Sequence, residues 1–126
     1  MTALCSPTRA ALLTGRNHHA VGFGSVGEFP GPFPGYCASR PQSCAPFPQV
    51  LQMNGYSTAG FGKWHLTPDH QQGPAGPFDR WPNAWGLDYF WGFLGGEAGQ
   101  YDPMLAENNS IIAVSGSSDA PAAIGE

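Results

Sequence analysis

The stretch CSPTRAALLTGR, residues 5–16, decides how the chain starts to fold. Ser6 belongs to the residue types that cap helices, and Pro7 suits the first helical position. The alanines and leucines that follow favour a helix, and Gly15 is typical of a residue that ends one. The stretch therefore predicts a helix that starts near Ser6 and stops at Gly15.

The same stretch carries a Cys-x-Pro-x-Arg pattern, in which Cys5 lies just ahead of the helix and Arg9 follows four residues later near the same face. Free N–H groups at a helix start attract anions, and a guanidinium adds a planar fork of donors. The pattern thus predicts a site for a small tetrahedral anion such as sulfate or phosphate. The plainer alternative is a half-buried cysteine before an ordinary helix, with Arg9 in solvent.

A long loop is predicted over residues 17–48, because glycine or proline interrupts every few residues and neither helical nor strand periodicity can develop. Loops of this length commonly surround an active site or are disordered. The loop contains the pair His18-His19, which lacks a third spaced ligand, so we interpret it as polar loop rather than a metal site. The pair Asp69-His70 is interpreted in the same way.

A short helix and a strand are predicted next. Apolar residues at helical spacing indicate the helix, which Gly55 ends, and the run from Tyr56 to Phe61 predicts the strand. Lys63 and His65 follow the strand in a loop. Loops at the carboxyl ends of strands present ligand-binding groups in α/β sheets, so both are candidate functional residues. The helical positions are Phe47, Val50, Leu51 and Asn54.

Residues 85–93 form an aromatic cluster with room for one more short strand. From Ser110 onward aromatic residues vanish and small residues dominate, which predicts a frayed tail over residues 110–126. The predicted fold class is therefore α/β and loop-rich, with one folded region over residues 1–109.

A chain of 126 residues has room for one domain at most. A hydrophobic content of 41% is enough for a core, and a formal net charge of -4 gives no basic field for nucleic acid or an anionic membrane. Neither a transmembrane segment nor a signal peptide is visible, so the expected location is cytoplasmic by default. Three cysteines always leave one unpaired, which makes a disulfide framework an unfavoured interpretation.

Two blocks of the sequence resemble the type I sulfatase family, with bacterial arylsulfatases as the nearest branch. The first is the opening stretch at residues 5–16, and the second is GYSTAGFGKWHL at residues 55–66, where a strand leads into Gly-Lys-Trp-His. A third segment, GLDYFWGF at residues 86–93, is similar to the family form Gly-Phe-Asp-x-Phe-x-Gly. The resemblance covers roughly residues 2–109. It implies a sulfuric ester hydrolase with an alkaline-phosphatase-like fold.

The resemblance also implies a role for each candidate residue. In the family, the residue that matches Cys5 is oxidised to formylglycine, whose hydrated aldehyde attacks the sulfur of the ester and later expels sulfate. By matching positions, Arg9 would hold this group, Lys63 would contact it or the bound sulfate, and His65 would act as base. Trp64 is interpreted as packing beneath the loop. The implied partners are a small sulfate ester and a formylglycine-forming maturation enzyme.

Calcium is the metal that the resemblance implies, held in part by the formylglycine made from Cys5. Calcium takes about six to eight oxygen ligands. The other family ligands, an acidic pair upstream and an Asp-Asn pair far downstream, are not in this sequence. We therefore expect an N-terminal fragment that carries an incomplete fold and is inactive by itself.

Two other interpretations remain open at this point. Phosphonate monoester and phosphodiester hydrolases of the same superfamily also use Cys-x-Pro-x-Arg, so the ester could contain phosphorus rather than sulfur. The chain could also be a non-catalytic remnant, which at most serves as a substrate for the enzyme that converts Cys5.

Overall fold

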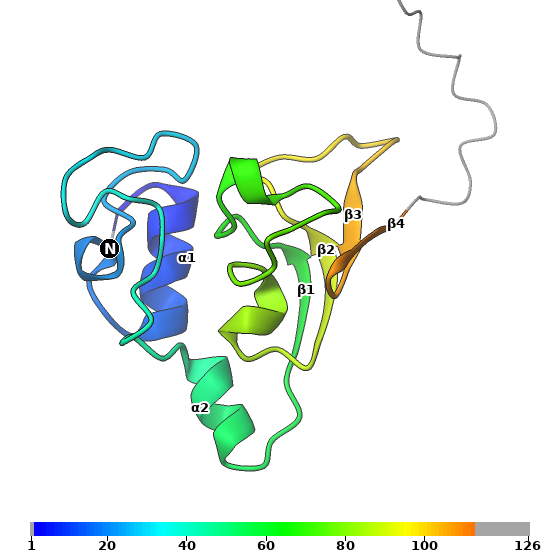
Figure 1. Cartoon of the computed structure of the whole chain (residues 1–126), viewed down its shortest axis with the longest axis horizontal. Helices are drawn as coiled ribbons and strands as arrows, with labels where there is room; N and C mark the ends of the chain where they lie inside the picture. The colour runs from blue at the N-terminus through cyan, green and yellow to red at the C-terminus, as the bar shows by residue number, and fades with distance from the viewer. Residues whose placement is uncertain (1, 113–126) are drawn as a thin grey trace, which may run out of the picture.

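The computed structural model describes residues 2–112, in which helices and a four-stranded mixed sheet form an α/β unit, as the sequence predicts. Figure 1 shows α1 and the long loop after it on one side and the sheet on the other. No helix within this range is long and apolar enough to cross a membrane. The elements are α1 (Cys5–Thr14), η1 (His18–Val21), α2 (Phe47–Met53), β1 (Ala59–Lys63), η2 (Asp69–Gln71), η3 (Pro82–Trp85), β2 (Tyr89–Phe93), β3 (Leu105–Glu107) and β4 (Ser110–Ile112).

The first helix matches its prediction at one end and differs at the other. Gly15 ends α1 with a left-handed φ of 64°, and its N–H donates to the carbonyl of Ala11. The cap expected from Ser6 is wrong, because α1 begins after Leu4 and has no side-chain cap. Ser6 is instead fully buried, and its hydroxyl accepts a hydrogen bond from the N–H of Gly27 at 2.9 Å. The Ser6 hydroxyl, which the local sequence predicts as a helix cap, is therefore used in a tertiary contact instead.

The sheet has the order β1-β2-β3-β4, with β1 and β2 parallel and the other pairs antiparallel. The strand expected over Tyr56–Phe61 lies further along the chain, at Ala59–Lys63. Pairing with β2 sets this register, since Ala59 lies opposite Tyr89 and Lys63 lies opposite Phe93. The shift places Lys63 on the last position of β1 rather than in the loop after it.

The C-terminal boundary of the folded region also differs from the expectation. Residues 110–112, expected to begin the frayed tail, form β4 and pair with β3. Ile111 packs against the hydrophobic core, which gives this short strand a reason to stay in the sheet. The rest of the expected tail, residues 113–126, lies outside the described residues.

Large aromatic side chains form the centre of the core. Trp64 is 3% exposed and packs edge-on against Trp85 and Phe90, with ring centroids 5.4 and 5.9 Å apart. This confirms the expectation that Trp64 packs beneath the loop. The long loop over residues 17–48 contributes to the same core through Phe23, which is 1% exposed.

The second helix has the predicted position, and most of its apolar face is exposed. α2 begins after Pro46 and ends at Met53, close to the expected range. Its apolar side chains are exposed, with Phe47 at 49% and Val50 at 47%. Within residues 2–112 the apolar face of α2 is therefore largely uncovered.

Gly92 of β2 lies opposite Gly62 of β1, and their backbones leave no room for a side chain. A Cβ added at Gly92 would stand 1.9 Å from the carbonyl oxygen of Gly62. We expect Gly92→Ala to lower the free energy of unfolding by about 2–3 kcal/mol, because backbone atoms cannot move aside without breaking the pairing of β1 and β2. Urea denaturation measures the loss. Gly73→Ala is the matched control, since its Cβ would meet no atom within 4 Å, and equal stability of the two variants would contradict the prediction.

Candidate functional site

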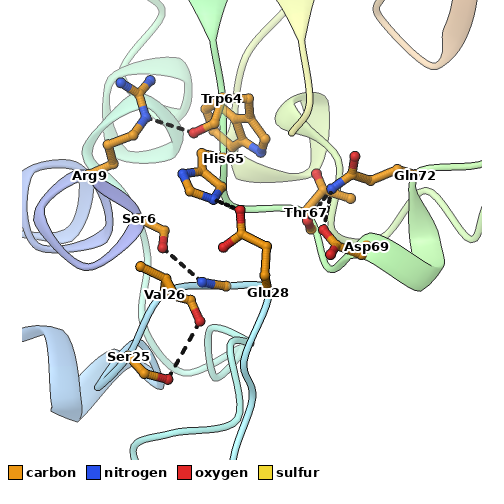
Figure 2. A network of polar contacts seen from close by, with 11 residues as sticks. Ser6, Arg9, Ser25, Val26, Glu28, Trp64, His65, Thr67, Asp69 and Gln72 are labelled. Carbon is orange, nitrogen blue, oxygen red and sulfur yellow. Dashed lines mark hydrogen bonds and ion pairs between the residues drawn. The ribbon is translucent and has the colours of Figure 1, made fainter. Parts of the chain in front are cut away.

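Arg9 joins α1 to the end of β1. Its Nε donates to the carbonyl oxygen of Trp64 at 2.7 Å (Figure 2). Its Nη2 donates to the carbonyl oxygen of Lys63. Residues more than fifty positions apart in sequence thereby meet. The contact brings the start of the first helix to the carboxyl end of the first strand, which is where the sequence placed its candidate residues.

Arg9 is a partly buried cation. Burial lowers its pKa, and the neighbouring Cys5 acts in the opposite direction. A guanidinium remains protonated in proteins and has five N–H donors. The two bonds to Lys63 and Trp64 use two of these, and the remaining donors have no hydrogen-bond partner among residues 2–112.

Cys5, Arg9 and Lys63 line one open hollow of about 470 Å³ at the start of α1. The thiol of Cys5 is exposed and is not in a disulfide. Lys63 is the only lysine of the chain, and it gives the hollow a second positive charge. The expectation that Cys5 and Arg9 face a common volume is thus confirmed. Thr2, Ala3, Leu4 and Thr8 complete the lining.

His65 lies two residues beyond β1 and has an unusual backbone. Its φ is 59°, in the left-handed region that residues other than glycine rarely adopt. Hydrogen bonds hold this conformation, because the N–H of Trp64 donates to Phe93 and the N–H of His65 donates to Leu94, at 2.9 and 3.0 Å. Pairing with the β2 chain thus continues past the end of β1. These two backbone hydrogen bonds fix the direction of the His65 side chain.

The side chain of His65 does not line the hollow of Cys5. It is 5% exposed, and its Nε2 lies 2.6 Å from Oε1 of Glu28 (Figure 2). Sequence analysis missed Glu28, which is a single acid in a loop of glycine and proline without any periodic pattern. The one available signal was that loops of this length surround active sites.

The remaining histidines named in the sequence analysis make contacts within their own loops or lie in short helical turns. Nδ1 of His18 bonds to the carbonyl of Phe23, and Nε2 of His19 bonds to the hydroxyl of Tyr36. His70 lies in η2. Among residues 2–112 no group of three His, Cys, Asp or Glu side chains is placed to hold a metal ion.

The fold and this hollow define a mixed α/β protein in which two cationic side chains lie beside an exposed cysteine. The family model described as Sulfatase matches residues 1–121. The chain therefore belongs to the sulfatase family, as the two sequence blocks predict. The match extends beyond residue 109, where the resemblance was expected to end.

Curated relatives agree with this assignment. The chain is 35% identical to an uncharacterized sulfatase of Schizosaccharomyces pombe, over 85% of this chain and 20% of that protein. It is 32% identical to an N-acetylglucosamine-6-O-sulfatase of Bacteroides thetaiotaomicron, over 92% of this chain and 17% of that protein. Dog arylsulfatase G is 37% identical over 70% of this chain and 14% of its own length. The chain thus spans about a fifth or less of these relatives.

A solved structure supports the fold. The crystal structure of Ps i-CgsB superposes with a TM-score of 0.67 at 27% identity, over 87% of this chain and 27% of that one. Another structure of the same protein is a complex with k-i-k-neocarrahexaose. The chain accordingly has part of the alkaline-phosphatase-like fold that the resemblance implied.

The bonds of Arg9 lead to a stability prediction. Arg9→Lys keeps the charge but loses the fork, so a single ammonium cannot serve both carbonyls with the same geometry. We expect the free energy of unfolding to fall by about 1–2 kcal/mol, measured by urea denaturation. Arg16→Lys is the control, because Arg16 is exposed and its replacement should change stability by less than about 0.5 kcal/mol. A loss for Arg9→Lys no larger than that of the control would contradict the role of the fork.

Proposed function

We propose that this chain is the nucleophile-bearing portion of a longer sulfatase, which hydrolyses small sulfate esters at a site built around residue 5. Family membership supports the reaction class, and the coverage of the relatives supports a longer protein. The observation that carries the proposal is the common hollow of Cys5, Arg9 and Lys63. It places one reactive side chain beside two cations, and a sulfate group is an anion of matching size and charge.

Cys5 fits conversion to formylglycine by a maturation enzyme. The side chain is free and exposed, so another protein can reach it without opening the core. When present, the formylglycine supplies a hydroxyl nucleophile through its hydrated aldehyde, which a plain thiol does not. Its position at the first residue of α1 keeps it next to Arg9 one helical turn later.

The remaining residues bind the anion and move a proton. Arg9 keeps free N–H donors for sulfate oxygens after bonding to the β1 carbonyls, and Lys63 adds a mobile ammonium from the end of β1. His65 lies directly after the carbonyl that Arg9 binds, and it would accept a proton when sulfate leaves. These roles rest on matching positions in the family together with the geometry of the hollow.

Calcium does not fit the described residues on their own. Calcium takes about six to eight oxygen ligands, and residues 2–112 hold no cluster of three candidate ligands. Residue 5 alone would provide one ligand. We therefore propose that the other ligands come from the rest of the longer protein, and that this chain by itself does not turn over substrate.

The first prediction from this proposal concerns Cys5 itself. When the chain is co-expressed with a formylglycine-generating enzyme, intact mass and peptide mass spectrometry should show the CH2SH group of Cys5 replaced by an aldehyde. Cys37 is also exposed but lacks the Cys-x-Pro-x-Arg pattern, so it should stay a thiol and serves as the internal control. A Cys5 that remains a thiol under these conditions would contradict the proposal.

The second prediction compares substrates and nucleophile variants in the longer protein. It should hydrolyse an aryl sulfate faster than an aryl phosphonate monoester, and Cys5→Ala should lower kcat by about 10³-fold or more because the nucleophile is lost. Cys37→Ala should keep the parent rate, and the 126-residue chain alone should show no turnover even with calcium. Faster phosphonate turnover would favour the phosphorus ester alternative, and no turnover of either ester would favour a non-catalytic remnant. Full activity of Cys5→Ala would contradict the role of residue 5 as nucleophile.

A further inference from the structure

The contact between Glu28 and His65 joins two buried or half-buried groups from distant parts of the chain. The Oε1–Nε2 distance is 2.6 Å, and the side chains are 33% and 5% exposed, respectively. A short contact between a carboxylate and a ring N–H is a strong hydrogen bond when it is largely shielded from water. Figure 2 shows Glu28 rising from its loop to meet the ring.

We propose that Glu28 is a positioning residue for catalysis, which holds His65 in the tautomer that has its proton on Nε2 and its free lone pair on Nδ1. The inference rests on the proposed function in one respect, because it takes His65 as the proton acceptor of the reaction. A carboxylate accepts hydrogen bonds only, so it selects the tautomer that donates to it. The same carboxylate stabilises the imidazolium that forms once Nδ1 takes a proton.

No other group of the described residues competes for the second ring nitrogen of His65. Nδ1 of His65 is buried and has no hydrogen-bond partner among the described residues. In Figure 2 it lies on the side of the ring that faces α1 and Arg9. A buried polar atom without a partner costs free energy and calls for an explanation, and a catalytic role is one such explanation. A proton acceptor needs a lone pair of this kind, which no other group of the described residues occupies.

The loop that carries Glu28 is attached to the helix that carries the nucleophile. The N–H of Gly27 donates to Oγ of Ser6 at 2.9 Å, and Ser6 directly follows Cys5. Oγ of Ser25 donates to the carbonyl of Phe29 at 2.8 Å, which closes the loop on itself around Glu28. The position of the carboxylate is thus set relative to residue 5, and this explains why Ser6 is a fully buried polar residue.

A third segment, after β2, closes against the pair. A Cβ added at Gly96 would lie 2.6 Å from Oε1 of Glu28 and 2.8 Å from Nε2 of His65. Any side chain at this position would therefore push into the hydrogen bond itself. The neighbouring Gly95 is different, since its Cβ would meet its nearest atom at 3.5 Å, an ordinary contact. Gly96 provides the space in which the pair fits.

This difference between neighbouring glycines gives a matched test in the longer sulfatase. Glu28→Ala and Gly96→Ala should each lower kcat for an aryl sulfate by about 10- to 100-fold, the size expected for the partner of a functional side chain. KM should change less than about twofold, because Arg9 and Lys63 still bind the anion. Gly95→Ala should keep the parent kcat. Added formate should restore part of the activity of Glu28→Ala, where the carboxylate is missing, but not of Gly96→Ala, where the space is filled.

The tautomer of His65 is measured without turnover by the 15N signals of its ring in the 126-residue chain. The parent and Gly95→Ala should have the proton on Nε2, whereas Glu28→Ala and Gly96→Ala should show a mixture of tautomers. Glu28→Gln, which preserves the side-chain volume, guards against a folding defect and should also have a reduced kcat, because it cannot stabilise the imidazolium.

Each outcome has a distinct meaning. A parent kcat in Glu28→Ala or Glu28→Gln would overturn the positioning role, and so would one and the same His65 tautomer in all variants. Equal losses in Gly95→Ala and Gly96→Ala would overturn it as well, since the effect would then be general damage to the loop. A longer protein with no sulfatase activity would overturn the proposed function alone, because the ring signals test Glu28 separately.

Discussion

The guanidinium of Arg9 is the interaction on which the arrangement of the site depends. By donating to the carbonyls of Lys63 and Trp64, it fixes the start of α1 against the carboxyl end of β1. The two sequence blocks that resemble the sulfatase family lie on these two elements. Without this link, an exposed cysteine and the cationic end of a strand would be separate features of the surface. With it, Cys5, Arg9 and Lys63 share one hollow.

The long glycine- and proline-rich loop completes the site from the other side. Its backbone bonds to Ser6 of α1, and its only acid, Glu28, bonds to the ring of His65. The loop after β2 brings Gly96 against the same pair. Three segments without regular structure therefore meet around one imidazole, each held by contacts to α1 or the sheet. Loops carry function in this way when a rigid framework positions them.

Local sequence predicted the parts of the fold that local physics controls. Gly15 ends α1 because glycine adopts a positive φ without steric cost. The aromatic run near Tyr89 contains a strand, as its composition predicts. Errors arose where distant contacts decide. Ser6 bonds to Gly27 instead of capping, the first strand shifts to pair with β2, and Ile111 keeps β4 in the sheet.

The amino-acid sequence by itself determined the class of this protein, through two blocks that resemble the sulfatase family. It also indicated three residues that line one hollow, because Cys5 and Arg9 lie one helical turn apart and Lys63 follows the predicted strand. It could not reveal Glu28, whose partner lies 37 positions away. Nor could it reveal that Gly96 must lack a side chain. Both depend on which segments pack together, and the free energy of packing comes from the whole core rather than from neighbouring residues along the chain. Only the tertiary structure decided how His65 is held.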